Sequence, residues 1–251
     1  MIVWREKLVA TAIHFGATLV LAAIAAALIF LVWYPPPFQK MVGGTELFML
    51  VVGCDLALGP LMSLVIYNSR KPRRELLTDY TIVGLIQISA LVYGVLVVAD
   101  TRPAYVAFSG DRFEIVGAAE LRRKELADAR DPKYRTVSWT GPRYVAVVIS
   151  AADHENALFE ALAGNLEHVR PRFYVSYESQ LENIRNHAKK VADLAKRKPE
   201  SRGLLEEAAR DTGIADEHLG WLPVAHIKGF WTVLIDTRTS RPVAWIPVDP
   251  Y

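Results

Sequence analysis

Cysteine is nearly absent from this sequence of 251 residues, since Cys54 is the only one. A single cysteine excludes an intramolecular disulfide framework and a cysteine-rich zinc site. An excess of one charge is absent too, because 29 Lys and Arg residues face 27 Asp and Glu residues, for a formal net charge of +2. This near balance argues against a protein that binds nucleic acid through bulk charge, so we expect no nucleic-acid partner.

The usual motifs of catalysis and cofactor binding are missing as well. The sequence has no glycine-rich phosphate loop, nucleophile elbow or Cys-x-x-Cys pair. His154-Glu155 begins like a zinc-protease helix, but Leu158 stands where the second histidine is required. We therefore expect no enzyme, no cofactor and no metal site. A Ser/His/Asp set assembled only by the fold stays open.

Charge is spread unevenly along the chain. Residues 1–100 hold 13 charged side chains and residues 101–251 hold 43, and none lies between Lys7 and Lys40. The first part has the composition of a membrane region and the second that of a water-soluble domain. We expect a domain boundary at about residue 100.

Three apolar stretches in the first part are long enough to cross a bilayer: about residues 8–33, 47–67 and 81–99. The first far exceeds the 7–15 apolar residues of a signal peptide, so we interpret it as a span that is kept. It ends in Trp33-Tyr34 and three prolines, typical of an interfacial aromatic anchor followed by a stop.

The basic residues of the short loops predict the orientation of the spans. Arg5 and Lys7 precede the first span, only Lys40 lies in the first loop, and four basic residues lie between 70 and 74. The positive-inside rule puts the N-terminus and the second loop in the cytoplasm. Residues 101–251 then lie outside, which in a bacterium is the periplasm, and the spans lie in the inner membrane.

Polar residues inside the spans are candidate contact sites. Asp55 interrupts the second span, and a charged group there indicates a buried partner, either within this bundle or on another protein's helix. His14 and Gln87 lie at similar depth, so we expect a hydrogen-bonded packing pair rather than a proton relay. Gly84, Gln87 and Gly94 share one face of the third span, and small and polar residues mark helix interfaces.

Residues 101–251 predict an α+β domain with a core of its own. Short apolar runs between turn signals predict strands at 104–108, 112–116, 143–150, 172–177, 222–227, 231–236 and 242–246. Helix-period segments predict helices at 118–130, at 150–163, from Ser179 through Ala195, and at 200–210.

The membrane half carries a recognisable set of motifs, each short but specific as a group. They are Phe30-Leu31-Val32-Trp33-Tyr34-Pro35, then Gly44, Leu47 and Phe48, then Asp55-Leu56-Ala57-Leu58-Gly59-Pro60-Leu61, then Gln87 with Ala90-Leu91-Val92-Tyr93-Gly94, and finally Arg102-Pro103 and Asp111-Arg112-Phe113. Over about residues 8–116 the chain resembles the TfpX/TfpZ family of type IV pilin accessory proteins.

This resemblance implies a non-enzymatic role in type IV pilus biogenesis, as a membrane-anchored accessory protein or chaperone that supports the stability or surface assembly of a cognate pilin. Asp55, Gly59 and Pro60 are our candidates for the intramembrane contact. Asp55 is able to accept hydrogen bonds or to pair with a cation, Gly59 permits close helix approach, and Pro60 frees a backbone carbonyl one turn earlier. The alternative is that this segment only kinks the helix. A second functional alternative is a periplasmic module that binds a ligand or modifies pilin or the envelope.

Overall fold

The computed structural model describes residues 2–68 and 70–251. It divides into two compact units, Met1–Thr101 and Arg102–Tyr251, here called the helical unit and the sheet unit. The prediction of three long apolar helices followed by a mixed α/β region is confirmed.

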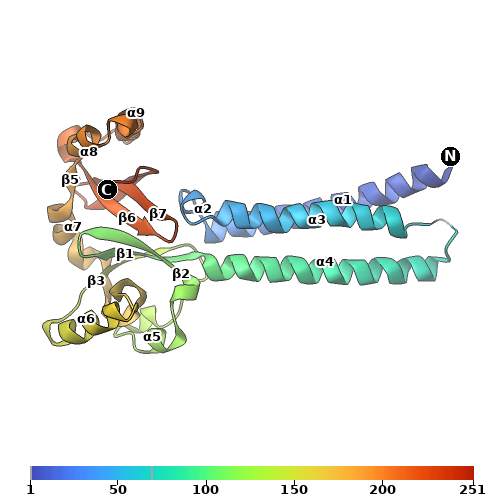
Figure 1. The fold of residues 1–251 in the computed structure, drawn as a ribbon, viewed down its shortest axis with the longest axis horizontal. Coiled ribbons are helices and arrows are strands. Elements are labelled where there is room, and N and C mark those ends of the chain that lie inside the picture. Colours follow the sequence, from blue (N-terminus) through green and yellow to red (C-terminus); the bar gives the residue numbers. More distant parts are fainter. Residues whose placement is uncertain (1, 69) are drawn as a thin grey trace. The chain divides into compact units, whose positions relative to one another are not determined.

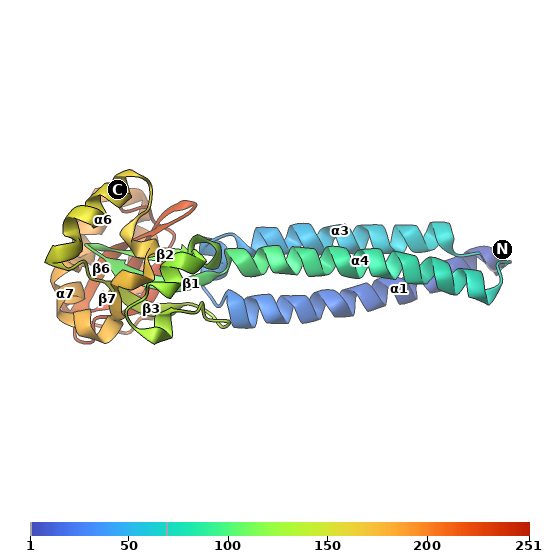
Figure 2. The same cartoon turned by 90° about the horizontal axis from the view of Figure 1, so that it is seen from below.

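The helical unit consists of three long helices and one short one. Figures 1 and 2 both show the long helices side by side, and α3 packs against both α1 and α4. The elements are α1 (Ile2–Ala27), its π-helical continuation η1 (Leu28–Trp33), α2 (Phe38–Met41), α3 (Gly44–Ile66) and α4 (Arg73–Thr101). By length and composition the segments Trp4–Trp33, Gly44–Ile66 and Arg73–Thr101 are able to cross a membrane. They extend the predicted stretches, most of all at the start of α4.

The sheet unit is built on a mixed sheet of eight strands. The strands are β1 (Pro103–Ser109), β2 (Arg112–Gly117), β3 (Arg143–Val147), β4 (Tyr174–Ser176), β5 (Lys189–Lys190), β6 (Leu219–His226), β7 (Gly229–Asp236) and β8 (Arg241–Ile246). Their order is β4-β3-β1-β2-β6-β7-β8, with β5 paired to β6. The pairs β1/β3 and β2/β6 are parallel and the others antiparallel. Strand β1 is buried at every position, so both of its faces are covered. This explains why its sequence is a nearly continuous apolar run.

Short helices surround this sheet. They are α5 (Arg123–Ala127), α6 (His154–Leu162), α7 (Leu181–His187), α8 (Val191–Arg197) and α9 (Arg202–Asp211). Single 3₁₀ turns lie between them at Ala118–Glu120, Pro132–Tyr134, Ala151–Asp153, Glu167–Val169, Pro171–Phe173, Tyr177–Gln180, Pro199–Ser201 and Asp216–His218.

Two apolar clusters make up part of the core of the sheet unit. One joins β1 and β3 to the α5 region and centres on Tyr105, Tyr134 and Tyr174. The other joins α8 and α9 to β6 and β7 around Trp221 and Leu234. Further buried side chains, among them Val106, Phe113 and Val233, belong to neither cluster, so the core extends along the sheet beyond both.

The predicted helix 118–130 is wrong. Only Arg123–Ala127 is helical, and a 3₁₀ turn at Ala118–Glu120 precedes it. The Glu120 side chain accepts a hydrogen bond from the backbone N–H of Gly117 at 2.6 Å. Leu121 follows with extended backbone and is buried in the first core cluster. Burial of this leucine outweighs the helix propensity of the segment.

The predicted single helix from Ser179 through Ala195 is also wrong. The chain forms α7, then the two-residue strand β5, then α8. Lys189 and Lys190 pair with Trp221 and Gly220 of β6, and the Trp221 indole N–H donates to the Lys190 carbonyl at 3.1 Å. The apolar stripe is real on each side, since Ile184 and Leu194 are buried, but an extended break separates its halves.

Candidate functional site

A polar cluster lies in the middle of the helical unit. His14 Nε2 of α1 and Gln87 Oε1 of α4 are 2.8 Å apart, so the predicted hydrogen-bonded pair is confirmed. Thr18, one turn further along α1, donates its hydroxyl to the His14 carbonyl. The pair joins two apolar helices through a hydrogen bond between their side chains.

Gly59 brings α3 against this pair. A Cβ atom added at Gly59 would lie 2.6 Å from Gln87 Nε2 and 3.4 Å from His14 Nε2. Such a distance does not occur for real Cβ atoms, so a larger residue at position 59 would force the Gln87 amide to move. Gly59 thus faces neighbours of its own chain. Pro60 follows inside α3 and has no N–H to donate to the carbonyl four residues earlier.

Asp55, one turn before Gly59, borders a cavity of about 170 Å³. Its side chain is 9% exposed, and within residues 2–68 and 70–251 it has no hydrogen-bond or ion-pair partner. The cavity is lined by side chains of all three long helices: His14, Ala17, Thr18, Leu21, Ala22, Val52, Asp55, Gly84, Gln87, Ile88 and Leu91. A buried carboxylate with no partner is costly, so Asp55 marks this cavity as a candidate contact site.

The two glycines predicted on one face of α4 have different surroundings. Gly84 lines the cavity, and a Cβ atom there would meet nothing within 4 Å. Gly94 packs against α3, where an added Cβ would lie 2.5 Å from Val51 Cγ1. The predicted contact residues therefore divide: Asp55, Gly84 and Gln87 reach the cavity, whereas Gly59 and Gly94 hold the helices together.

Further polar contacts join the three long helices at the end of the bundle where α1 begins and α3 ends. Ser63 and Tyr80 are joined by a 2.7 Å hydroxyl hydrogen bond, and Lys7 Nζ donates to the Leu64 carbonyl. Lys71 pairs with Asp79 at 2.6 Å. These contacts explain why α4 begins before the predicted apolar stretch, since Asp79 is held inside the helix by a basic partner.

Trp33 and Tyr34 are buried, not exposed as the predicted aromatic anchor requires. Both belong to an apolar cluster with Ile29 and Val98, and the Tyr34 hydroxyl donates to the Val98 carbonyl at 2.8 Å. A Cβ at Gly44 would lie 2.6 Å from the Tyr34 ring, so the start of α3 also depends on this packing. These aromatic side chains close one end of the bundle.

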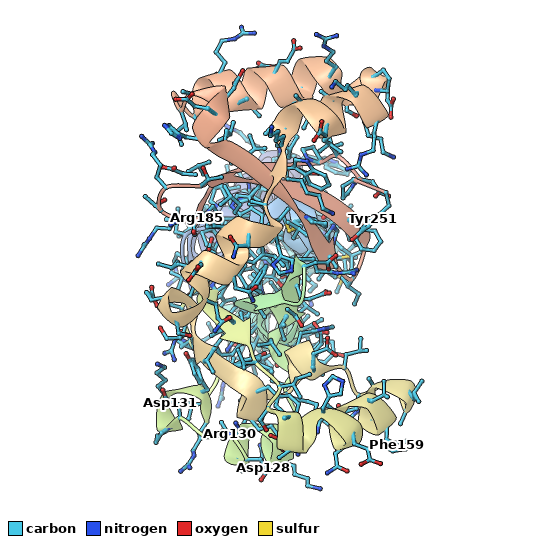
Figure 3. The ribbon with its side chains drawn as sticks, turned by 90° about the vertical axis from the view of Figure 1, so that its left-hand side faces the viewer. Asp128, Arg130, Asp131, Phe159, Arg185 and Tyr251 are labelled. Atoms are coloured by element: carbon cyan, nitrogen blue, oxygen red, sulfur yellow. The ribbon has the colours of Figure 1, made fainter. Side chains whose placement is uncertain are left out.

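The sheet unit offers two surface features that the sequence did not indicate. Helix α6 exposes Leu158, Phe159 and Leu162 at 57%, 62% and 79%, while Ala157 faces inward. Figure 3 shows Phe159 at the periphery of the unit. The apolar residues of α6 occupy more than one side of the helix, so they cannot all face the core. This distribution in the sequence could have predicted an exposed apolar surface.

The second feature is a groove of about 980 Å³ between α8, α9 and the start of β6. Its lining mixes basic residues such as Lys190 and Arg210 with acidic ones such as Glu206 and Asp216. Among the described residues no group of three or more His, Cys, Asp or Glu side chains is arranged to hold a metal ion. The groove has room for a ligand, but its lining mixes positive and negative side chains and so does not indicate the charge of that ligand.

Electrostatics in the sheet unit single out Glu114 on β2. Burial raises the pKa of this carboxyl to about 7, the positive charge of Arg112 opposes the shift, and nearby carboxylates led by Glu167 add to it. Burial also lowers the pKa of His168 on the neighbouring turn. Glu114 lies on β2 and His168 in the turn Glu167–Val169, and neither residue lines the groove.

These features define a class: a bundle of three apolar helices with an unsatisfied polar centre, followed by a mixed-sheet unit with an exposed apolar helix. The family model for the fimbrial assembly protein FimB matches residues 2–43. A serogroup I fimbrial assembly protein of Dichelobacter nodosus is 32% identical over 247 residues, which cover 95% of this chain and 94% of that relative.

Other relatives from the same organism agree. The serogroup E1 protein is 31% identical over 243 residues, covering 95% of this chain and 94% of its own length. The protein of serogroups C1 and C2 is 38% identical over 117 residues, 47% of this chain and 89% of that relative. The chain therefore belongs to the FimB family of fimbrial assembly proteins. No solved structure matches it.

Proposed function

We propose that this protein is a membrane-anchored, non-enzymatic accessory factor of type IV pilus biogenesis that supports the stability or surface assembly of a cognate pilin. Its family supports a role in fimbrial assembly, since similar proteins along its whole length carry that name. The motifs over about residues 8–116 support the narrower assignment to the TfpX/TfpZ type. The partners are the pilin, other pilus assembly components and the lipid bilayer.

The proposed location is the inner membrane of a bacterium, with three spans. The N-terminus and the loop between α3 and α4 lie in the cytoplasm, and the sheet unit lies in the periplasm. The basic residues support this orientation, because Arg70 and Lys71 lie in the loop between α3 and α4, and Arg73 and Arg74 lie in the first turn of α4. A pilin with a membrane helix and a periplasmic head would then meet both units of this protein.

The observation that carries the proposal is the unsatisfied cavity beside Asp55. Helices do not associate in a bilayer through the hydrophobic effect, so polar groups and small residues provide much of the attraction. Asp55, Gly84 and Gln87 offer both at one place. Gly59, Pro60 and Gly94 belong to the proposed site as the residues that shape the helices around it.

A deletion strain tests the function directly. We expect loss of surface fimbriae and a lower pilin level, both restored by the wild-type chain, and we expect pilin to be recovered with this protein after crosslinking of intact membranes. Asp55→Leu should lower pilin recovery while leaving this protein's own membrane level unchanged. Normal fimbriae in the deletion strain would rule the function out, and collapse of the Asp55→Leu protein would make Asp55 structural.

Two glycine variants provide a matched test of the cavity. Gly84→Leu fills the cavity from α4, and Gly53→Leu adds the same side chain on α3, where a Cβ also meets nothing within 4 Å. Gly53 is exposed and does not line the cavity. We expect reduced pilin recovery for Gly84→Leu alone. Equal effects of the two variants would point to general disturbance of the bundle.

The groove in the sheet unit favours a second candidate, a periplasmic module that binds a ligand or modifies pilin or the envelope. Its volume of about 980 Å³ is in the range of ligand sites. Mass spectrometry of the purified full chain under native conditions tests this candidate. A bound small molecule that is lost in an Ala192→Trp variant, which places a large side chain in the groove from an exposed position of α8, would support it over the accessory role.

A further inference from the structure

The cavity beside Asp55 has the size of one side chain. Its volume of about 170 Å³ is close to that of an engineered cavity of roughly 150 Å³ that holds benzene. A helix does not fit, but one side chain reaching in from an adjacent helix does. Ile88 lines the cavity and is 52% exposed, so the cavity reaches the outer surface of the bundle.

Three polar groups at the cavity have no hydrogen-bond partner for at least one atom among the described residues. Asp55 lacks one among the described residues, and two buried atoms of the His14–Gln87 pair, His14 Nδ1 and Gln87 Nε2, also lack one. Exchanging the oxygen and nitrogen of the Gln87 amide would only leave the other atom unpaired. Helix packing inside the described part of the chain therefore pairs one polar atom each of His14 and Gln87, and leaves the second atom of each and the Asp55 carboxylate unpaired.

The basic side chains near the bundle do not supply the missing partner. No Lys or Arg occurs between Lys7 and Lys40, in Gly44–Ile66, or between Arg74 and Thr101. Lys7 and Lys71 are engaged with Leu64 and Asp79. A carboxylate that stays ionised at this depth is compensated by an opposite charge. His14 also lines the cavity, but its Nε2 is bonded to Gln87 and neither of its ring nitrogens bonds to Asp55. A cation from another molecule is therefore the candidate partner.

We infer that the cavity receives a cationic side chain or amine from the membrane helix of a partner, which pairs with Asp55 while a neighbouring polar atom bonds to Gln87. The inference rests on the proposed function, because the partner is the membrane protein whose assembly this chain supports. Gly84 keeps the entry open, since its missing side chain leaves the α4 wall of the cavity empty.

Photocrosslinking from the full-length protein in native membranes tests the inference. A benzophenone amino acid replaces Ile88, which lines the cavity, and in a control it replaces Ile82, which is equally exposed on α4 but outside the cavity lining. We expect an adduct only from position 88, to a membrane segment that contains a Lys, an Arg or a terminal amine. Asp55→Asn keeps the shape but removes the charge, and we expect it to lower the adduct yield at least roughly ten-fold, with Asp55→Glu retaining more than Asp55→Asn.

Several results would overturn the inference. An unchanged yield with Asp55→Asn would mean that the contact needs no charge, and adducts to lipid alone would mean that lipid or water fills the cavity. If Asp55→Asn does not accumulate, neutralising the cation in the crosslinked segment tests the same pair from the other side and should lower the yield equally. Fimbriae restored by Asp55→Asn with unchanged adducts would reject the ion pair and leave the accessory function standing, whereas fimbriae unaffected by deletion of the whole chain would reject that function.

Discussion

Gly59 and Gly84 lie on neighbouring helices of the bundle, yet a methyl group added at each meets different surroundings. At Gly59 it would lie 2.6 Å from Gln87 Nε2, and at Gly84 it meets open space. We expect Gly59→Ala to displace Gln87 from His14 and to destabilise the bundle by about 1–3 kcal/mol. Gly84→Ala should be neutral or slightly stabilising. Thermal unfolding of the full-length protein in detergent, followed by near-UV circular dichroism, compares the two, and equal midpoints would contradict the close packing of Gly59 on Gln87.

Glu114 makes the stability of the sheet unit depend on pH. Its folded pKa of about 7 exceeds the ordinary 4.5 because of burial. Below pH 4.5 the carboxyl is protonated in both states and has no effect. Between pH 4.5 and 7 the unfolded state ionises while the folded state holds its proton, so stability falls as pH rises, by up to about 3 kcal/mol, and stays level above pH 7.

Glu114→Gln removes this dependence, because the amide does not ionise. We expect the variant to be more stable than the wild type at pH 8 and equally stable at pH 4. Urea unfolding of the full chain at both pH values measures the free energy of unfolding of the variant minus that of the wild type. Because the two proteins share all other titrating groups, the contributions of those groups cancel in this difference. A stability gain that is the same at both pH values would show that the effect is one of packing.

At the level of single residues, the sequence predicted contacts that depend on depth and missed those that depend on helix rotation. His14 and Gln87 meet because both lie at the same height in the apolar stretches. Gly84 and Gly94 were grouped by their spacing, but Gly94 packs against Val51 while Gly84 faces the cavity. The rotation of each helix about its own axis is set by packing among all three helices. The spacing of residues along one helix does not predict it.

Among the elements, the strands were predicted best because their apolar runs coincide with burial. Pro103–Ser109 is buried at every position, and the terminal strands β6, β7 and β8 lie where they were expected. The helices of the sheet unit were predicted less well. Extended breaks at Leu121 and at Lys189–Lys190 arise from burial in the core and from pairing with β6, both of which involve residues distant in the sequence.

The break between α7 and α8 depends on Gly220 of β6. An added Cβ at Gly220 would lie 2.8 Å from Ala188 Cβ, directly before β5. We expect Gly220→Ala to destabilise the sheet unit by about 1–3 kcal/mol by forcing β5 away. Gly203→Ala on α9 is the matched control: its Cβ meets nothing within 4 Å, and alanine should stabilise the helix by about 0.5–1 kcal/mol. Urea unfolding should therefore shift in opposite directions for the two variants.

For the whole molecule, the exposed side of α6 is the surface of the sheet unit best suited to a protein partner. Replacing both Phe159 and Leu162 by Ser removes apolar surface that is already in water, so folding should be little affected. If the periplasmic head of a pilin binds here, surface fimbriae should fall several-fold at an unchanged level of this protein. Leu204→Ser, at a 43% exposed position of α9, is the control. An equal loss with the control would assign the effect to the fold.

The orientation of the spans in the membrane decides whether the exposed side of α6 is able to meet the periplasmic head of a pilin. We predict this orientation from the basic residues near the ends of the helices and not from helix packing. Single cysteines in a Cys54→Ala background report it, one at Arg70 in the loop before α4 and one at Ile227, which is 85% exposed in the turn between β6 and β7. With a membrane-impermeant maleimide added after the outer membrane is opened, we expect labelling at 227 and protection at 70. Opening the inner membrane should expose position 70 as well. The reverse pattern would place the sheet unit in the cytoplasm, where α6 has no access to a periplasmic pilin head, and would leave the cavity in the spans as the one surface through which this chain reaches its partner.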